Sequence, residues 1–98
     1  MIYQIEITDD AKTDMSFFEM YERKIILAGI KEQLTHEPLK ETKNRKKLRD
    51  NPIAAWELRI GRYRIFYEVN KHIVTVTVVS VAMKRHNVLY IRNKEVKI

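Results

Sequence analysis

The residues best suited to chemistry lie in a stretch of alternating apolar and polar side chains, residues 56–67. Gly61 at its centre suits a two-residue type II′ turn with Arg62, because the first turn position needs a positive φ. Counting outward from the turn predicts a β-hairpin with the pairs Ile60/Tyr63, Arg59/Arg64, Leu58/Ile65, Glu57/Phe66 and Trp56/Tyr67. The two arginines of the second pair lie directly opposite each other and repel, and a bound phosphate would resolve this conflict.

The predicted register sorts the hairpin residues onto two faces. Ile60, Leu58 and Trp56, with the residues opposite them, form an apolar patch that we expect to pack in the core. Glu57 and Phe66 share the other face with the two arginines, and so does Glu68. A structural interpretation therefore competes with phosphate binding, in which the two diagonal carboxylates neutralise the arginines.

A run of cations before the hairpin is the second candidate for binding. Residues 1–37 carry four basic and eight acidic side chains, whereas residues 38–98 carry fifteen basic and five acidic ones, a net +10. Clustered cations are typical of proteins that bind a phosphate backbone, so nucleic acid is the leading partner class. The alternative is a solvated basic loop. The run contains Lys40, Lys43, Arg45, Lys46, Lys47 and Arg49, with Glu41 as its one carboxylate.

The elements that position these residues follow from hydrophobic periodicity. We expect a strand at 2–8, a helix that begins after Thr8 or Asp9, a second helix at about 21–34, and a basic loop from Pro38 to Pro52. After the hairpin come a strand at 72–83 and a short terminal hairpin at 88–98, interrupted at Arg92-Asn93. The order βααβββ is typical of an α+β fold with two N-terminal helices packed on one face of a mainly antiparallel sheet, which leaves the other face free to bind.

Length and composition exclude several classes of protein. Ninety-eight residues with 45% hydrophobic side chains predict one globular domain, 1–98. The absence of cysteine favours a cytoplasmic protein without disulfides, and no stretch resembles a signal peptide or reaches the roughly 20 apolar residues of a membrane span. His36, His72 and His86 are scattered without a carboxylate cluster, so we expect no metal site and no cofactor.

A family resemblance rests on two parts of the sequence. The run Asn44–Arg49 before Asn51-Pro52, followed by residues 56–69, resembles the leucine-arginine-x-glycine-x-tyrosine-arginine hairpin of the RelE/ParE toxin superfamily. The length and the order of elements are similar as well. The resemblance implies the toxin of a type II toxin–antitoxin pair, whose partner is a cognate antitoxin with an acidic tail. The basic C-terminal part would attract such a tail.

RelE-like members cut mRNA on the ribosome with the 2′-hydroxyl of the RNA as nucleophile, so the resemblance implies a metal-independent endoribonuclease. Cations must then stabilise a crowded phosphorane, and an acid or base must move protons. By position, Arg64 matches the hairpin arginine at the scissile phosphate, with Arg59 beside it. Lys84 or Arg85 supplies a further cation, and Tyr90 stacks on a base or handles a proton. The stretch Lys43–Arg49 would grip the RNA backbone through Lys43, Arg45, Lys46, Lys47 and Arg49.

The sequence also departs from the active RelE-like pattern. Ala55 and Glu57 stand where those toxins place lysines on the first hairpin strand. A carboxylate there would repel the substrate unless it acts as a base, and His86 is a further candidate acid or base. ParE-like members also lack the lysines, and they inhibit DNA gyrase instead. Gyrase inhibition and a catalytically inert antitoxin-binding module therefore stay open as alternatives to RNA cleavage.

Overall fold

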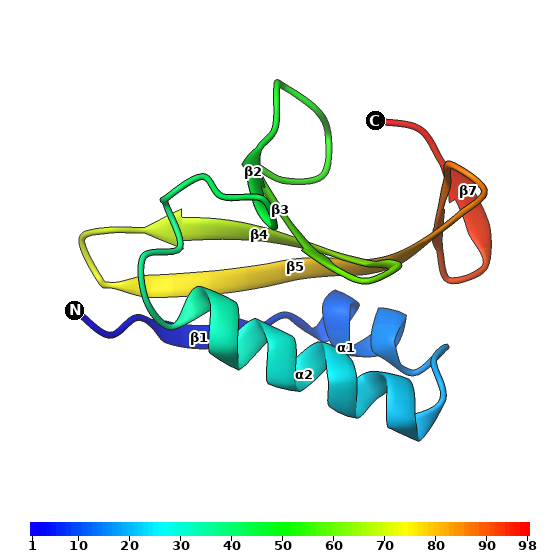
Figure 1. The fold of residues 1–98 in the computed structure, drawn as a ribbon, viewed down its shortest axis with the longest axis horizontal. Helices are drawn as coiled ribbons and strands as arrows, with labels where there is room; N and C mark the ends of the chain where they lie inside the picture. Colours follow the sequence, from blue (N-terminus) through cyan, green and yellow to red (C-terminus); the bar gives the residue numbers. More distant parts are fainter.

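The computed structural model describes all residues, 1–98, as two helices on one face of a sheet (Figure 1). The sheet order is β2-β3-β4-β5-β6-β7, and β1 pairs with β5 in parallel. The predicted α+β architecture is confirmed, with all strand pairs except β1–β5 antiparallel. The elements are β1 (Gln4–Ile7), α1 (Asp9–Met15), α2 (Met20–Leu34), β2 (Arg45–Lys47), β3 (Trp56–Ile60), β4 (Tyr63–Asn70), β5 (Thr75–Arg85), β6 (Val88–Ile91) and β7 (Lys94–Val96).

Both helices begin at polar residues that bind free backbone groups. The Thr8 hydroxyl accepts a hydrogen bond from the backbone N–H of Ala11 at 3.1 Å, as expected for an N-cap. At the start of α2, the Glu22 carboxylate accepts the backbone N–H of Glu19 at 3.0 Å. These contacts fix where each helix begins and so orient its apolar side toward the sheet.

The main core lies between the helices and the sheet. Ile26, Ile30 and Leu34 recur every four residues on α2 and are almost fully buried. They pack against the apolar patch that the hairpin register predicts. The cluster consists of Ala11, Met15, Ile26, Ile30, Leu34, Trp56, Leu58, Tyr63, Ile65, Tyr67, Val76, Val78 and Val81.

Gly29 lets α2 approach β3 closely, because a Cβ at this position would lie 2.9 Å from Ile60 Cγ1 and would also clash with Ile60 Cδ1. We expect Gly29→Ala to lower the free energy of unfolding by about 1–3 kcal/mol through overpacking, although alanine favours a helix. Denaturant unfolding measures the change. Adding Ile60→Val, which removes Cδ1, should restore part of the loss, and an equally unstable double variant would contradict the clash.

The face of β3, β4 and β5 that points away from the helices is here called the outer face. We predicted it to be free for binding, and this is wrong for part of it. Phe66 is fully buried there with Ala54 and Ala82. The loop between β2 and β3 covers it with Leu48 and Ile53, and the terminal hairpin covers it with Leu89 and Ile91, while Val79 of β5 packs beside them.

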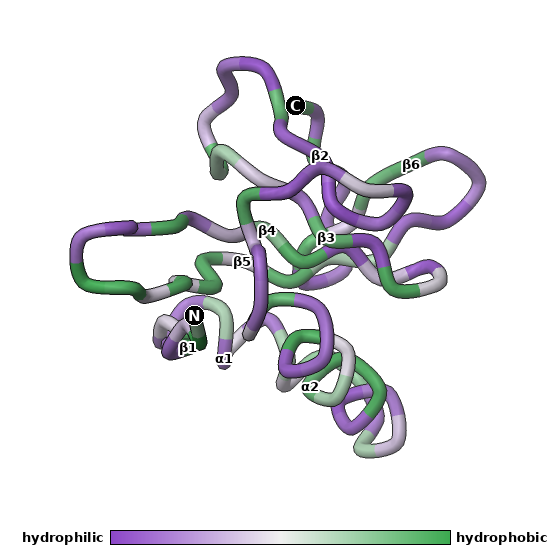
Figure 2. Tube along the Cα trace, turned by 60° about the vertical axis from the view of Figure 1, so that its left-hand side comes forward, coloured by the Kyte–Doolittle hydropathy of each residue, from purple (hydrophilic) through white to green (hydrophobic).

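The predicted basic loop contains a short edge strand, β2, which is a second correction. Arg45, Lys46 and Lys47 pair with Leu58, Glu57 and Trp56 of β3, because β3 would otherwise expose an unpaired edge. Figure 2 shows that the chain around β2 is mostly hydrophilic. The predicted terminal hairpin is confirmed as β6 and β7, with Arg92 and Asn93 both at positive φ in the turn.

No helix of the structure combines the length and the apolar character that a membrane span requires.

Candidate functional site

The β3–β4 hairpin has the predicted register in all five pairs, from Trp56↔Tyr67 to Ile60↔Tyr63. Gly61 has φ +55° and Arg62 does not adopt a positive φ, as a type II′ turn requires. Arg59 and Arg64 are direct cross-strand partners on the outer face. The hairpin therefore brings two cations to one place, as predicted.

The two arginines differ in their partners. Arg59 Nε donates to Glu57 Oε1 at 2.9 Å and forms an ion pair with it. Arg64 makes no ion pair; its Nη1 donates to the carbonyl oxygens of Gly61 and Tyr63 at 2.7 and 3.0 Å. Arg64 Nε is buried and has no hydrogen-bond partner. The interpretation in which carboxylates neutralise the two arginines thus holds for Arg59. It fails for Arg64, because no carboxylate forms an ion pair or a hydrogen bond with its guanidinium.

Burial lowers the pKa of the Arg64 guanidinium, and the charge of Arg59 lowers it further, while the charge of Glu57 opposes both effects. Glu68, the other diagonal carboxylate, instead accepts the backbone N–H of Ala55 at 3.1 Å. A buried donor without a partner and a cation that its surroundings do not neutralise both favour an anionic ligand.

Lys84 belongs to the same face. It lies two residues beyond Ala82, the cross-strand partner of Arg64, and it pairs with Leu89, which packs against the outer cluster. Lys46 reaches this face from β2, because it pairs with Glu57. The outer face thus combines Arg59, Arg64, Lys84 and Lys46 with the buried carboxylate of Glu57.

Arg85 and Tyr90 lie on the opposite face. Tyr90 pairs with Met83, which pairs with the core residue Tyr63, and Arg85 is two residues beyond Met83. The Arg85 guanidinium lies 5.9 Å from the centroid of the Tyr90 ring in a cation–π contact. The predicted catalytic residues are therefore divided, with Arg59, Arg64 and Lys84 on the outer face and the other two on the helix face.

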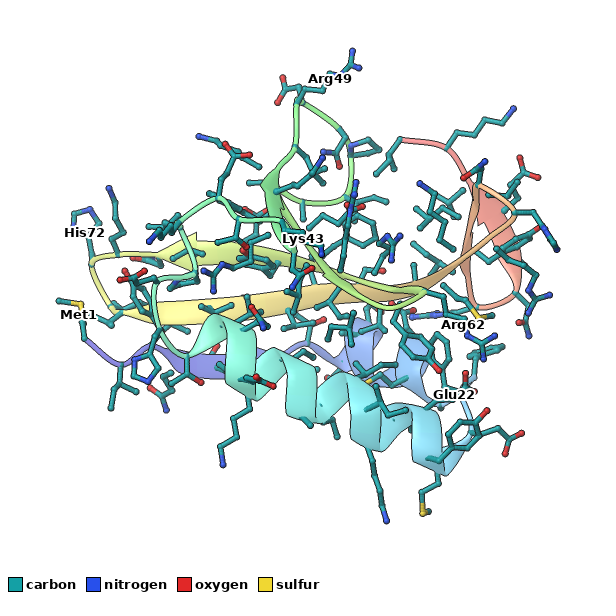
Figure 3. The ribbon with its side chains drawn as sticks, viewed as in Figure 1. Met1, Glu22, Lys43, Arg49, Arg62 and His72 are labelled. Atoms are coloured by element: carbon teal, nitrogen blue, oxygen red, sulfur yellow. The ribbon has the colours of Figure 1, made fainter.

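The basic stretch presents most of its cations to solvent. Lys43, Lys46, Lys47 and Arg49 are exposed, and Arg49 lies at the tip of the loop between β2 and β3 (Figure 3). Arg45 is used internally, since its guanidinium donates to Gln33 O at 2.6 Å and to Lys40 O at 3.1 Å. It joins the end of α2 to β2, and its predicted contact to a phosphate stays a prediction.

Asn51 gives the loop between β2 and β3 its shape. Its amide nitrogen donates to the carbonyl oxygens of Arg49 and Ala54 at 2.8 and 2.9 Å. Its amide oxygen accepts the backbone N–H groups of Ile53 and Ala54 at 2.8 and 3.1 Å. The sequence pointed to this residue only as part of the family resemblance.

His86 is exposed in the two-residue turn between β5 and β6, where it and Asn87 both have positive φ. The turn directly follows Arg85, the last residue of β5. Its role as an acid or base stays a prediction. No group of three or more histidine, aspartate or glutamate side chains has the arrangement of a metal site.

Two buried carboxylates that hold the site in place were missed by the sequence analysis. Glu22 on α2 accepts the Tyr63 hydroxyl at 2.7 Å and the Arg62 guanidinium at 3.1 Å, which ties the hairpin turn to the helix (Figure 3). Asp14 on α1 binds β5 and the terminal hairpin. The signal that could have found them in the sequence is an acidic residue on the apolar side of a helix. Such a residue indicates that a donor binds the carboxylate, but it does not identify the donor.

Glu22 predicts a pH dependence of stability. The hydrogen bond from Tyr63, followed by those from Glu19 N–H and Arg62, holds the pKa of Glu22 below its ordinary value of 4.5, although burial opposes this. Its stabilising contribution is therefore complete above pH 4.5 and is lost as the pH falls through the lower, folded-state pKa. We expect the stability of Tyr63→Phe to fall less on acidification than that of the wild type, in urea unfolding between about pH 7 and 3. Parallel pH curves would contradict this.

Comparisons with known proteins agree with this architecture. A family model described as the ParE toxin of the type II toxin–antitoxin system, parDE, matches residues 5–88. The chain is similar to the solved toxin–antitoxin complex RelBE2 from Mycobacterium tuberculosis, with a TM-score of 0.75 and 23% identity over 86% of this chain and 93% of that one. It is also similar to the archaeal RelE–RelB complex from Pyrococcus horikoshii OT3, with a TM-score of 0.65 and 20% identity over 83% and 93%. No curated protein sequence gives a significant match.

Proposed function

We propose that this chain, which belongs to the ParE toxin family of type II toxin–antitoxin systems, inhibits translation by cleaving ribosome-bound mRNA. The observation that supports this proposal is the state of Arg64. Its guanidinium carries a buried Nε without a partner and no ion pair, on a face that also presents Lys46 and Lys84. Such an arrangement suits a scissile phosphate, whose negative charge grows in the transition state.

The exposed cations of the β2 region supply the second part of the proposed RNA interface. Lys43, Lys46, Lys47 and Arg49 bind the RNA backbone, and the Asn51 hydrogen bonds hold the loop that carries Arg49. Backbone contacts position the RNA without reading its sequence. In this proposal, codon choice belongs to the ribosome and to the contacts near the scissile phosphate.

The proposed protein partner is a cognate antitoxin. Two solved structures similar to this chain are toxin–antitoxin complexes. Residues 38–98 carry a net charge of +10, so an acidic antitoxin segment would associate quickly with them. An antitoxin on the outer face would cover Arg64. The proposed ribosomal substrate places the activity in the cytoplasm.

Gyrase inhibition is the second candidate function, and a specific observation favours it. Arg85 and Tyr90 lie on the helix face, so they do not converge with Arg64 as a complete RelE-like set would. Glu57 also occupies the first hairpin strand, where active RelE-like toxins place lysine. A toxin that acts through protein contacts does not need these groups to converge.

A cell-free translation reaction tests the two functions. Purified chain is added to a reaction with a defined mRNA, and the 5′ ends of the mRNA are mapped. RNA cleavage predicts new ends at ribosome-protected codons, whereas the same mRNA without ribosomes stays intact. Intact mRNA in both reactions would refute the proposed cleavage, and a supercoiling assay with DNA gyrase would then test the second candidate.

A further inference from the structure

An open cavity of about 370 Å³ lies on the outer face between β3, β5 and the terminal hairpin. Its polar lining includes Glu57 from β3 and Lys84 from β5, and its apolar wall includes Leu89 and Val96. The cavity is next to Arg64, because Lys84 lies two residues beyond the cross-strand partner of Arg64. Any group bound at Arg64 would therefore extend toward a space lined by the side chains of Glu57 and Glu95 and by those of Lys84 and Lys97.

The Glu57 carboxylate is buried, with 7% of the residue exposed, and its two oxygens differ. Oε1 accepts the Arg59 Nε at 2.9 Å, whereas no hydrogen bond within the chain reaches Oε2. Lys84 likewise forms no ion pair within the chain, although two carboxylates line the same cavity. Arg59 thus engages one oxygen of the carboxylate and leaves the other, Oε2, as an acceptor without a partner on a residue that lines the cavity.

We propose that Glu57 and Lys84 are the general base and the general acid of RNA cleavage, a proposal that rests on the proposed function. Glu57 Oε2 takes the proton of the 2′-hydroxyl while the 2′-oxygen forms a bond to the adjacent phosphorus. The bond from phosphorus to the 5′-oxygen breaks, and the Lys84 ammonium donates a proton to that oxygen. The products are a 2′,3′-cyclic phosphate and a free 5′-hydroxyl, and proton exchange with water restores both side chains.

The same geometry explains why a carboxylate is tolerated among phosphate-binding cations. Arg64 and Arg59 stabilise the phosphorane, and Glu57 supplies the proton acceptor that an active RelE-like toxin would take from lysine. The charged groups around Glu57 are Lys46 of β2, Arg64 of β4, Lys84 of β5, Glu95 of β7 and Lys97 after it, besides Arg59 on its own strand.

The test compares single-turnover cleavage by full-length wild type, Glu57→Gln and Glu95→Gln on ribosomes that carry a synthetic mRNA. Glutamine keeps the shape of Glu57 and its contact to Arg59 but cannot accept the proton, so we expect a loss of at least about 100-fold. We also expect the acidic limb of the pH–rate profile to disappear. Glu95 is exposed and lines the same cavity, and its variant should cleave within about threefold of the wild type.

The role of Lys84 is tested by the leaving group. Lys84→Met should cleave normal RNA slowly but should recover on an mRNA with sulfur in place of the 5′-oxygen, because a leaving thiolate needs no proton. Glu57→Gln should not recover on that RNA. Cleavage by Glu57→Gln at the wild-type rate, or an unchanged pH profile, would overturn the proposal while the proposed function stands. Intact mRNA with the wild type would refute both.

Discussion

Replacing Arg64 with alanine is expected to slow mRNA cleavage by about 10²–10³-fold, the usual cost of losing one preorganised donor at an oxyanion. The guanidinium is fixed by the carbonyl oxygens of Gly61 and Tyr63, so it needs no reorganisation when charge develops on the phosphate. Single-turnover cleavage on programmed ribosomes measures the effect. Arg64→Lys should recover only part of the rate, because an ammonium group keeps the charge and loses the planar fork.

A matched control for Arg64 is Lys24→Ala. Lys24 is an exposed cation on α2, on the helix side of the protein, and its removal changes the net charge by the same amount. We expect its cleavage rate to stay at the wild-type level. If Arg64→Ala and Lys24→Ala cleaved at similar rates, the assignment of the scissile phosphate to Arg64 would be wrong.

Replacing Asp14 with alanine is expected to lower the free energy of unfolding by about 3 kcal/mol, because it removes a buried carboxylate that accepts two buried donors and pairs with the half-exposed Arg92. Asp14 Oδ2 accepts the Ser80 hydroxyl at 2.9 Å and the Val81 N–H at 3.0 Å, and Oδ1 accepts the Arg92 guanidinium at 2.6 Å. One carboxylate thus joins α1, β5 and the terminal hairpin. Asp14 is only 2% exposed. Its loss therefore leaves the Ser80 hydroxyl and the Val81 N–H without an acceptor and removes the ion pair of Arg92.

Guanidinium unfolding followed by the fluorescence of Trp56 measures this effect, because Trp56 is the only tryptophan and is buried against Tyr67. Asp10→Ala is the control. Its carboxylate also faces Arg92, but at 3.6 Å and with 89% of the side chain exposed, so we expect little change. Equal unfolding midpoints for the two variants would contradict the assigned role of Asp14.

The local parts of the fold could be predicted because they depend on neighbours in the sequence. The Gly61-Arg62 turn and the two-residue period fix which residues oppose each other, so the pair Arg59/Arg64 followed without a structure. The N-cap at Thr8 and the break at Arg92-Asn93 are signals of the same kind. By contrast, β1 was predicted as a strand, but its parallel pairing with β5 joins residues about 71 positions apart and leaves no local signal.

The faces on which Lys84, Arg85 and Tyr90 lie could not be predicted, because a β-bulge in β5 changes the alternation. Phe66 pairs with Ser80 and Tyr67 with Val78, so Val79 is an extra residue. With regular alternation along the same sequence and no bulge, Lys84 would share the face of Val78, which is in the main core. The inserted residue instead places Lys84 with Arg64 and sends Arg85 to the helix face with Tyr90.

The sequence by itself determined the elements other than β2, the hairpin register, the cation pair and the family, since each depends on local patterns of residue type and spacing. Only the tertiary structure decided that Glu57 bonds Arg59 and leaves Arg64 without an ion pair, that Phe66 is covered, and that Glu57 and Lys84 share a cavity. Those facts depend on contacts between distant segments and on one bulge. A one-residue shift in alternation moves every later side chain of a strand to the other face.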